Sequence, residues 1–267
     1  MIPPLAQKHL ISMANAGYTP TSKVVSGLAH LGFNLTTNCI DNGVTYVPVH
    51  TLLEAYWPIA GNSFNSHKWN FINNSIHLMT VGVSVPTESN NLVTFIGTGV
   101  ASYRTDINPN TLGLSQSHGF GYQEISAVDR GNVASVWSAG GYAPDGTVSS
   151  LLSAAQSGGA SDAGIDNDYN LNLAVTNSVS NGFWDIVRNG TTLTLYKNGI
   201  SFGTRTRTAT ANPNITYDFG GTNQNGTHVG IGPQNMSCCN MWVWKNSPTA
   251  TQELSFYNAA NKFHTTQ

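Results

Sequence analysis

The chain has 267 residues and a formal net charge of −2, from 11 lysines and arginines against 13 aspartates and glutamates. So small a net charge gives no long-range field that would attract a phosphate backbone, and we expect no nucleic-acid partner. Charged residues make up only 9% of the chain; Asn, Thr, Ser and Gly take their place, which is typical of surfaces that pack against copies of themselves or meet sugars.

The first 74 residues predict a helical and loop extension that precedes the main domain. Apolar residues recur at helical spacing from about residue 5 to 16, and again from a cap at Thr21 or Ser22 to a stop at Gly32. Helices this short are marginal alone. Their apolar stripes therefore either lie on the rest of the chain or dock the protein on a partner, and the pattern leaves both readings open.

The N-terminal residues contain no apolar stretch typical of a secretory signal, and no apolar run in the chain is long enough to span a membrane. We therefore expect a protein assembled in the cytoplasm where it is made, without membrane insertion.

Residues 34–74 predict a short strand, one helical turn at about residues 50–56, and a polar loop. The histidines of this region and just beyond it, His50, His67 and His77, have the spacing of no metal motif. Cys39, Cys238 and Cys239 are odd in number and two are adjacent, so they predict buried thiols and no disulfide framework. No metal or other cofactor is predicted.

From residue 75 to residue 267 the sequence predicts one β-sandwich domain. Short alternating strands follow one another, separated by Gly, Asn and Pro turns and by no helices. The clearest are three runs within residues 183–207, each with one apolar face, punctuated by Asn189-Gly190 and Asn198-Gly199. Because these pairs suit tight hairpin turns, the segment predicts a three-stranded antiparallel meander.

A helix closes the chain. The segment TATQELSFYNAANKF, residues 249–263, begins at a cap, Thr249 or Thr251, and its predicted buried side carries Leu254, Tyr257 and Phe256. No repeat of fixed period is seen, so a solenoid or propeller is disfavoured.

The order of these elements resembles that of one family. The hairpin W-x-I-x-R-N-G-T-T-L-T-L-Y-K-N-G at residues 184–199 is followed by a glycine-rich strand HVGIG, a hydrophobic strand MWVW and the helix ending SFYNAANKF. This resembles the concanavalin A-like lectin and glucanase jelly roll, especially its laminin G-like versions in tailed-phage virion proteins. The segments TSKVVSGLAHLGF and TFIGTGVASYRTDINP are also similar to those phage proteins.

The resemblance covers most of the chain from about residue 20. It implies a mainly β fold: an antiparallel jelly-roll β-sandwich, concanavalin A-like, with short N-terminal helices and a C-terminal helix. It also implies a virion setting, with copies of the chain and other virion proteins as partners.

The sequence does not carry the catalytic acids of the family's glucanases. Those enzymes place alternate acids of an E-x-D-x-x-E motif on one strand, whereas the nearest acids here, Glu124 and Asp129, are five residues apart and fall on opposite faces. No G-x-S-x-G motif marks a serine nucleophile. We therefore predict no catalytic residue and no enzyme.

Calcium is a common companion of this fold, and one acidic segment bears on it. Asp162, Asp166, Asp168 and Asn170 begin like a calcium loop, but the sixth-position Gly and twelfth-position Glu are missing. A solvated loop is the competing interpretation, and no metal ligand is assigned.

Exposed aromatic rings would be needed to stack on sugars. Trp137 and Tyr142 flank a glycine-rich turn and are candidates, while Trp184, Trp242 and Trp244 lie on alternating strands and predict core positions. No binding-site residue is assigned from the sequence.

Three functions remain open. The first is a non-enzymatic virion structural protein, a capsid decoration or a tail or fibre protein, whose lectin-like jelly roll adheres to a host surface. The second is a soluble carbohydrate-binding lectin module. The third, a glycan hydrolase, lacks its carboxylate motif.

Overall fold

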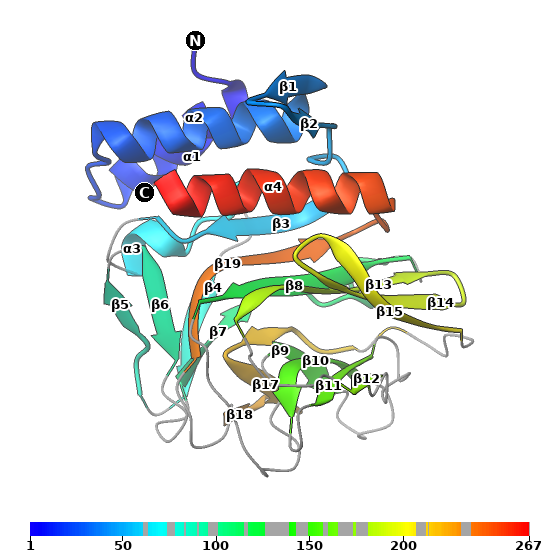
Figure 1. Cartoon of the computed structure of the whole chain (residues 1–267). Coiled ribbons are helices and arrows are strands. Elements are labelled where there is room, and N and C mark those ends of the chain that lie inside the picture. The colour runs from blue at the N-terminus through cyan, green and yellow to red at the C-terminus, as the bar shows by residue number, and fades with distance from the viewer. Residues whose placement is uncertain are drawn as a thin grey trace.

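The structure is a computed structural model of the whole chain. It describes residues 1–60, 64–73, 78–82, 84–89, 91–95, 101–114, 117–125, 139–142, 149–156, 160–164, 173–174, 181–206, 212, 214–230 and 236–266. Within these residues three layers are stacked: a layer of helices, an inner sheet and an outer sheet (Figure 1).

The inner sheet lies between the helices and the outer sheet. Its path is β15-β14-β13-β8-β19-β6-β5, and β3 also pairs with β19. The eight strands are β3 (Leu53–Pro58), β5 (Thr87–Ser89), β6 (Leu92–Phe95), β8 (Gly119–Glu124), β13 (Gly182–Asn189), β14 (Thr192–Lys197), β15 (Ile200–Thr206) and β19 (Met236–Trp244).

The outer sheet packs its inner face against the inner sheet, and together they form the sandwich. Its path is β12-β11-β10-β9-β16-β7-β4, with β17 and β18 paired beside β9. The nine strands are β4 (Leu78–Gly82), β7 (Ala101–Thr105), β9 (Ala139–Tyr142), β10 (Ser149–Gln156), β11 (Ala160–Gly164), β12 (Leu173–Ala174), β16 (Asp218–Phe219), β17 (Gly221–Gln224) and β18 (Thr227–Gly230).

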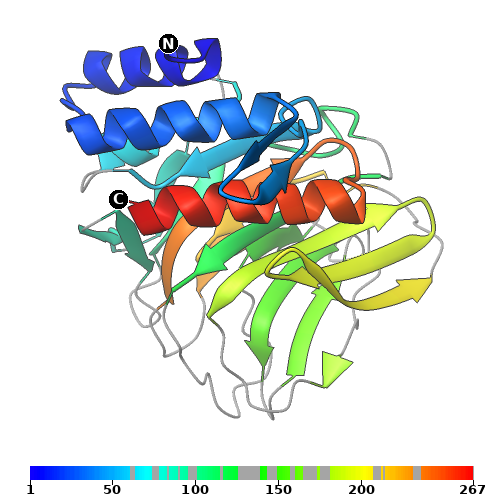
Figure 2. The same ribbon diagram turned by 45° about the horizontal axis from the view of Figure 1, so that its top comes forward.

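The helices lie on the face of the inner sheet that points away from the sandwich (Figure 2). They are α1 (Pro4–Asn15), α2 (Ser22–Thr36) and α4 (Ala250–Thr266); a short α3 (Phe64–His67) and a small hairpin of β1 (Cys39–Asp41) and β2 (Val44–Tyr46) complete the described elements. No helix of the described residues is long and apolar enough to cross a membrane. The predicted mainly β sandwich with terminal helices is therefore confirmed.

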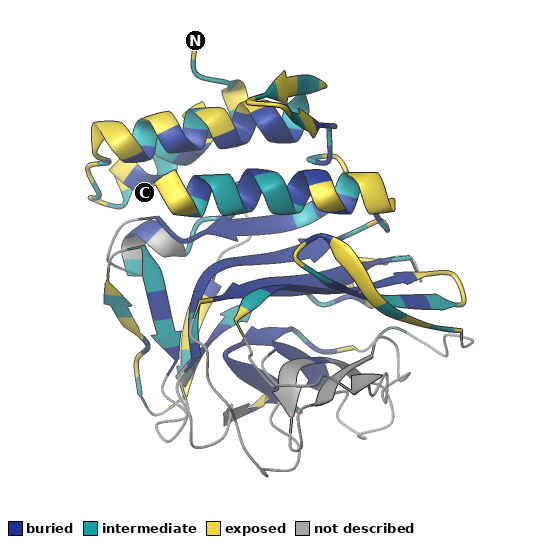
Figure 3. Ribbon diagram, in the orientation of Figure 1, coloured by how far each residue is buried: buried dark blue, intermediate teal, exposed yellow. Residues whose placement is uncertain are grey.

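Two apolar cores result from this stacking, one on each face of the inner sheet (Figure 3). The sandwich core holds Trp184 and Ile186 of β13, packed with Phe219 and other residues of the outer sheet. The helix-side core holds Trp242 and Trp244 of β19 with apolar residues of α1, α2 and α4. The predicted core positions of Trp184, Trp242 and Trp244 are confirmed, since all three are fully buried.

The N-terminal helices pack against the rest of the chain. Leu28, Leu31 and Leu35 of α2 and Met13 of α1 belong to the helix-side core, so their apolar stripes face the chain itself. Thr21 Oγ1 caps α2 by accepting from the Val24 N–H at 3.3 Å. Strand β3, which lies within residues 1–74, pairs with β19; the sandwich thus takes a strand from that region.

Two local predictions in this region are wrong. Gly32 does not end the second helix, which continues to Thr36; instead, a Cβ at Gly32 would lie 3.4 Å from Ala6 Cβ, so the glycine allows α1 to approach α2 closely. The predicted helical turn at residues 50–56 is reduced to a hydrogen-bonded turn that ends at Leu52, whose N–H donates to the Val49 carbonyl at 2.9 Å, because Leu53–Pro58 becomes the strand β3 beside β19. Sheet pairing overrides the local pattern there.

The meander of β13, β14 and β15 is confirmed, with antiparallel registers Trp184↔Lys197 and Lys197↔Ile200. Asn198 and Gly199 form its second turn, with φ of 53° and 73°. Two details differ from the prediction: β13 is buried on both faces, and Ile200 and Phe202 of β15 are exposed because β15 is the edge strand.

The C-terminal helix begins after Thr249, which forms a capping box with Gln252. Thr249 Oγ1 accepts from the Gln252 N–H at 3.3 Å, and Gln252 Oε1 accepts from the Thr249 N–H at 2.9 Å. Phe256 is fully buried as predicted, but Leu254 is 41% exposed. The helix therefore meets the sheet with a face that includes Phe256 but not Leu254, which differs from the predicted face.

This difference gives a stability test. Phe256→Ala removes a ring that packs on Trp242, Trp244, Tyr56 and Phe183, so we expect a loss of about 3 to 5 kcal/mol in the free energy of unfolding. Leu254→Ala, on the same helix, is expected to cost about 1 kcal/mol. Urea denaturation followed by tryptophan fluorescence measures both; equal losses would contradict this orientation of α4.

Candidate functional site

A polar pocket of about 430 Å³ lies where α4 meets the ends of β8, β13 and β14. We call it the polar pocket. It is lined by Gln123, Glu124, Ile125, Asn181, Gly182, Lys197, Asn198, Tyr257 and Asn261. Four of the nine residues carry side-chain amides, which both donate and accept hydrogen bonds.

The Asn198-Gly199 turn positions one side of this pocket. Asn198 Oδ1 accepts from the Phe183 N–H at 3.0 Å, and the Asn198 N–H donates to the Phe183 carbonyl at 2.8 Å. A Cβ at Gly199 would lie 2.9 Å from both Leu254 Cα and Tyr257 Cβ. The glycine thus lets α4 sit directly on the turn, which brings Tyr257 to the pocket.

Tyr257 is half-buried, and its ring meets Phe183 edge-on, with centroids 5.5 Å apart. It has a supported ring and also borders open space, which is the arrangement that stacking on a ligand requires. Neither its neighbour Phe183 nor the indole of Trp242 is free for this purpose, since both are fully buried and stacked on each other at 3.9 Å.

A chain of buried amides runs from the core to the floor of the pocket. Tyr56 Oη donates to Asn240 Oδ1 at 2.6 Å, and Asn240 Nδ2 donates to Gln123 Oε1 at 2.6 Å. Gln123 Nε2 then donates to Asn261 Oδ1 at 3.2 Å. Because each amide is oriented by the one before it, the polar groups of Gln123 and Asn261 are fixed before any ligand arrives.

The charged groups of the pocket are one cation and one carboxyl. The ammonium of Lys197 lies 4.5 Å from the centroid of the Trp184 ring, and burial lowers the pKa of this lysine. Glu124 is almost fully buried at the end of β8. It is the one acid among the lining residues, so the described part of the pocket does not form the carboxyl pair of a glycoside hydrolase.

The acids predicted from the sequence fall in different places. Glu124 lines the polar pocket, whereas Asp129 lies outside the described residues. Asp166, Asp168 and Asn170 also lie outside them, as does the side chain of Asp162 in β11. The calcium hypothesis is therefore untested, and the described residues contain no group of three or more potential metal ligands.

The aromatic, histidine and cysteine residues singled out from the sequence lie in different parts of the chain. Trp137 and the side chain of Tyr142 lie outside the described residues, as do the side chains of His67 and His77. His50 Nδ1 donates a hydrogen bond to the Leu35 carbonyl oxygen at 3.3 Å, so this histidine links two segments of the backbone. All three cysteines are free; Cys238 and Cys239 are buried as predicted, while Cys39 is half-buried.

A serine, a histidine and an aspartate do meet in the outer sheet. Ser102 Oγ lies 2.9 Å and Asp218 Oδ2 lies 3.1 Å from the same ring nitrogen, His228 Nδ1. A catalytic triad needs the serine at Nε2 and the acid at Nδ1, so this geometry is not a triad. Arg104 pairs with Asp218 at 2.7 Å and completes a structural cluster.

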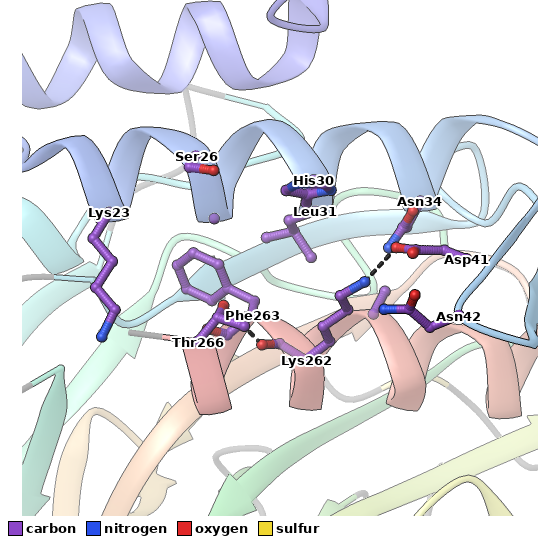
Figure 4. A pocket seen from close by; sticks show the side chains of 12 residues that line it. Lys23, Ser26, His30, Leu31, Asn34, Asp41, Asn42, Lys262, Phe263 and Thr266 are labelled. Carbon is purple, nitrogen blue, oxygen red and sulfur yellow. Dashed lines mark hydrogen bonds and ion pairs between the residues drawn. The ribbon is translucent and has the colours of Figure 1, made fainter.

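A second cavity, of about 350 Å³, lies between α2 and α4 and is closed by the β1–β2 hairpin (Figure 4). On its wall, the ammonium group of Lys262 pairs with the Asp41 carboxylate and lowers the pKa of that carboxyl. Its floor is apolar, with Leu31 and Phe263. We call this cavity the groove between α2 and α4. Because Lys262 and Asp41 neutralise each other, the groove presents fewer polar groups to a ligand than the polar pocket does.

Comparison with known proteins supports the fold. No family model and no curated protein matches the sequence. A receptor-binding domain of botulinum neurotoxin mosaic serotype C/D is similar in structure, with a TM-score of 0.57 and 14% identity over 79% of this chain and 51% of that one.

Two other solved structures are comparable. A mutant Trypanosoma rangeli sialidase displaying trans-sialidase activity gives a TM-score of 0.60 at 9% identity, covering 90% of this chain and 38% of that one. The binding domain of Paraclostridial mosquitocidal protein 1 gives 0.57 at 12% identity, covering 79% and 52%. The chain thus spans about half or less of these proteins. At such identities the likeness concerns the fold alone, which is a β-sandwich.

The buried amide chain gives a second stability test. Asn240→Ala leaves the Tyr56 hydroxyl and the Gln123 amide without this shared partner, so we expect a loss of about 2 to 4 kcal/mol in the free energy of unfolding. Asn261→Ala, at the half-buried end of the same chain, is expected to cost less than about 1 kcal/mol. Urea titration measures both, and a neutral Asn240→Ala would show that the amides are not coupled.

Proposed function

We propose that the chain is a non-enzymatic, lectin-like module whose polar pocket binds a glycan. The observation that carries this proposal is the pre-oriented set of amides at Gln123, Asn198 and Asn261 beside the half-buried ring of Tyr257. Amides in fixed positions suit the paired donor and acceptor character of sugar hydroxyls, and the ring offers a face for the apolar side of a pyranose.

We further propose that the module is a structural component of a virion, as a capsid decoration or a tail or fibre protein, where it meets the host surface. The resemblance of its sequence to tailed-phage virion proteins supports this setting, and so does its weakly charged, amide-rich composition. The similarity in structure to one domain named as receptor-binding and to another named as a binding domain fits an adhesive role. Its partners would be other virion proteins, copies of itself and a cell-surface glycan.

Glycan binding is tested on an array of immobilised glycans with the full chain. Tyr257→Ala is expected to weaken retention at least tenfold, which corresponds to about 1.4 kcal/mol of binding free energy. Lys262→Ala, in the groove between α2 and α4, is the matched control and is expected to leave retention unchanged. Loss with Lys262→Ala alone would move the site to the groove, and loss with Trp137→Ala alone would move it to the glycine-rich turn.

The virion setting is tested by immunogold electron microscopy of purified particles from the lysate in which the protein is produced, with an antibody raised against the full chain. Regular labelling on heads or tails is the expected result. Antigen found free in the lysate, with unlabelled particles, would contradict the virion role and favour a soluble lectin module.

A further inference from the structure

Two carboxyl side chains face each other in the helix-side core. Asp185 lies on β13, between Phe183 and Val187, and Glu253 lies in the first turn of α4; both are fully buried. The two carboxyls interact directly, and Asp185 Oδ1 and both carboxyl oxygens of Glu253 have no other hydrogen-bond partner among the described residues. A hydrogen bond between them requires that one of them carries a proton, because two carboxylates have no donor between them.

Among the described residues, no positive charge compensates this pair. The Trp244 indole N–H donates to Asp185 Oδ2, and no described lysine, arginine or histidine contributes to the pKa shift of either carboxyl. Arg188 of β13 falls on the alternate face of the strand and donates to the Gly190 carbonyl. A proton on one of the two carboxyls therefore neutralises its charge, as a cation would in an ordinary buried ion pair.

The same face of α4 connects this pair to the polar pocket. Glu253, Tyr257 and Asn261 follow one another at four-residue spacing, which places them in one row along the helix. The first of the three contacts Asp185, and the other two line the pocket. The docking of α4 on β13 thus sets where the ring and the amide of the pocket stand.

We propose that the Asp185–Glu253 pair is a protonation-dependent latch, which holds α4 and the pocket side chains Tyr257 and Asn261 in place while protonated and releases them when its last proton leaves. The latch rests on the proposed function only in its consequence for ligand binding. Its structural action on α4 stands on the geometry of the pair itself.

The direction of the pH effect follows from the environment of the two carboxyls. Burial raises the pKa of Asp185 to about 7, and burial together with the charge of Asp185 raises the pKa of Glu253 well above its ordinary value. In the unfolded chain both ionise near pH 4. The folded form therefore holds more protons, and its stability decreases as pH rises from about 4 through 7 and beyond.

The other titratable groups near the helix-side core behave differently. Burial raises the pKa of Tyr196 of β14, and the charges of Glu253 and Asp185 add to this rise. Burial lowers the pKa of His9 of α1 to about 3, so His9 stays neutral over the range of the latch. The Asp41–Lys262 pair belongs to the groove between α2 and α4. Lys197 in the pocket also has a lowered pKa, so ligand binding alone would not isolate the latch.

The test is hydrogen–deuterium exchange of the full chain, read on peptides covering residues 250–266 and corrected for the intrinsic pH dependence of exchange. Wild-type protection of α4 is expected to fall at least tenfold between pH 6 and pH 9.5. Glu253→Gln is expected to keep its protection over this range, because an amide donates to the Asp185 carboxylate without needing a titratable proton.

Two further variants keep the test decisive. Asp185→Asn serves where Glu253→Gln folds poorly, and Asp106→Asn, at an exposed carboxyl, is the control that should follow the wild type. Identical pH profiles for the wild type and both latch variants would overturn the proposal. If α4 loses protection in the wild type and in the control but not in the latch variants, while no glycan is retained at any pH, the latch stands and the proposed glycan function fails.

Discussion

The burial of the inner sheet on both faces is the constraint on which the rest of the structure depends. On one side Trp184 and Ile186 fill the sandwich, and on the other Phe183 stacks on Trp242 at 3.9 Å beneath α4. Gly121 makes this stack possible, because a Cβ there would lie 2.4 Å from Trp242 Cζ2. Without the helices, the large indoles of β19 would be exposed to water, at a cost proportional to their apolar area.

The candidate site is a product of the same constraint. Since α4 must cover the stack of Phe183 and Trp242, its Tyr257 and Asn261 come to rest beside the ends of β8 and β14. The amides of Gln123 and Asn261 are then joined to the core through Asn240. A pocket that is built on core contacts in this way is rigid, which favours recognition of a ligand whose hydroxyls need fixed partners.

When α4 covers the sheet, polar side chains of the helix and of β13 are also buried, and their desolvation costs free energy. These side chains are Asp185 and Glu253, and a proton shared between them offsets part of the desolvation free energy. Elsewhere the outer sheet solves a similar problem with a cation, since Arg104 pairs with Asp218 there.

The sequence by itself determined the elements whose signals are local. Alternation and the Asn198-Gly199 pair predicted the meander, a cap at Thr249 or Thr251 predicted the start of α4, and the tryptophans of β19 were predicted to be buried. The tertiary structure alone decided which face of α4 is buried, that residues 53–58 form a strand, and that Gln123, Asn181 and Asn261 meet at one pocket. The physical reason is that these outcomes depend on pairing and packing between separate segments of the chain, and the periodicity of a single segment cannot show what will lie opposite it.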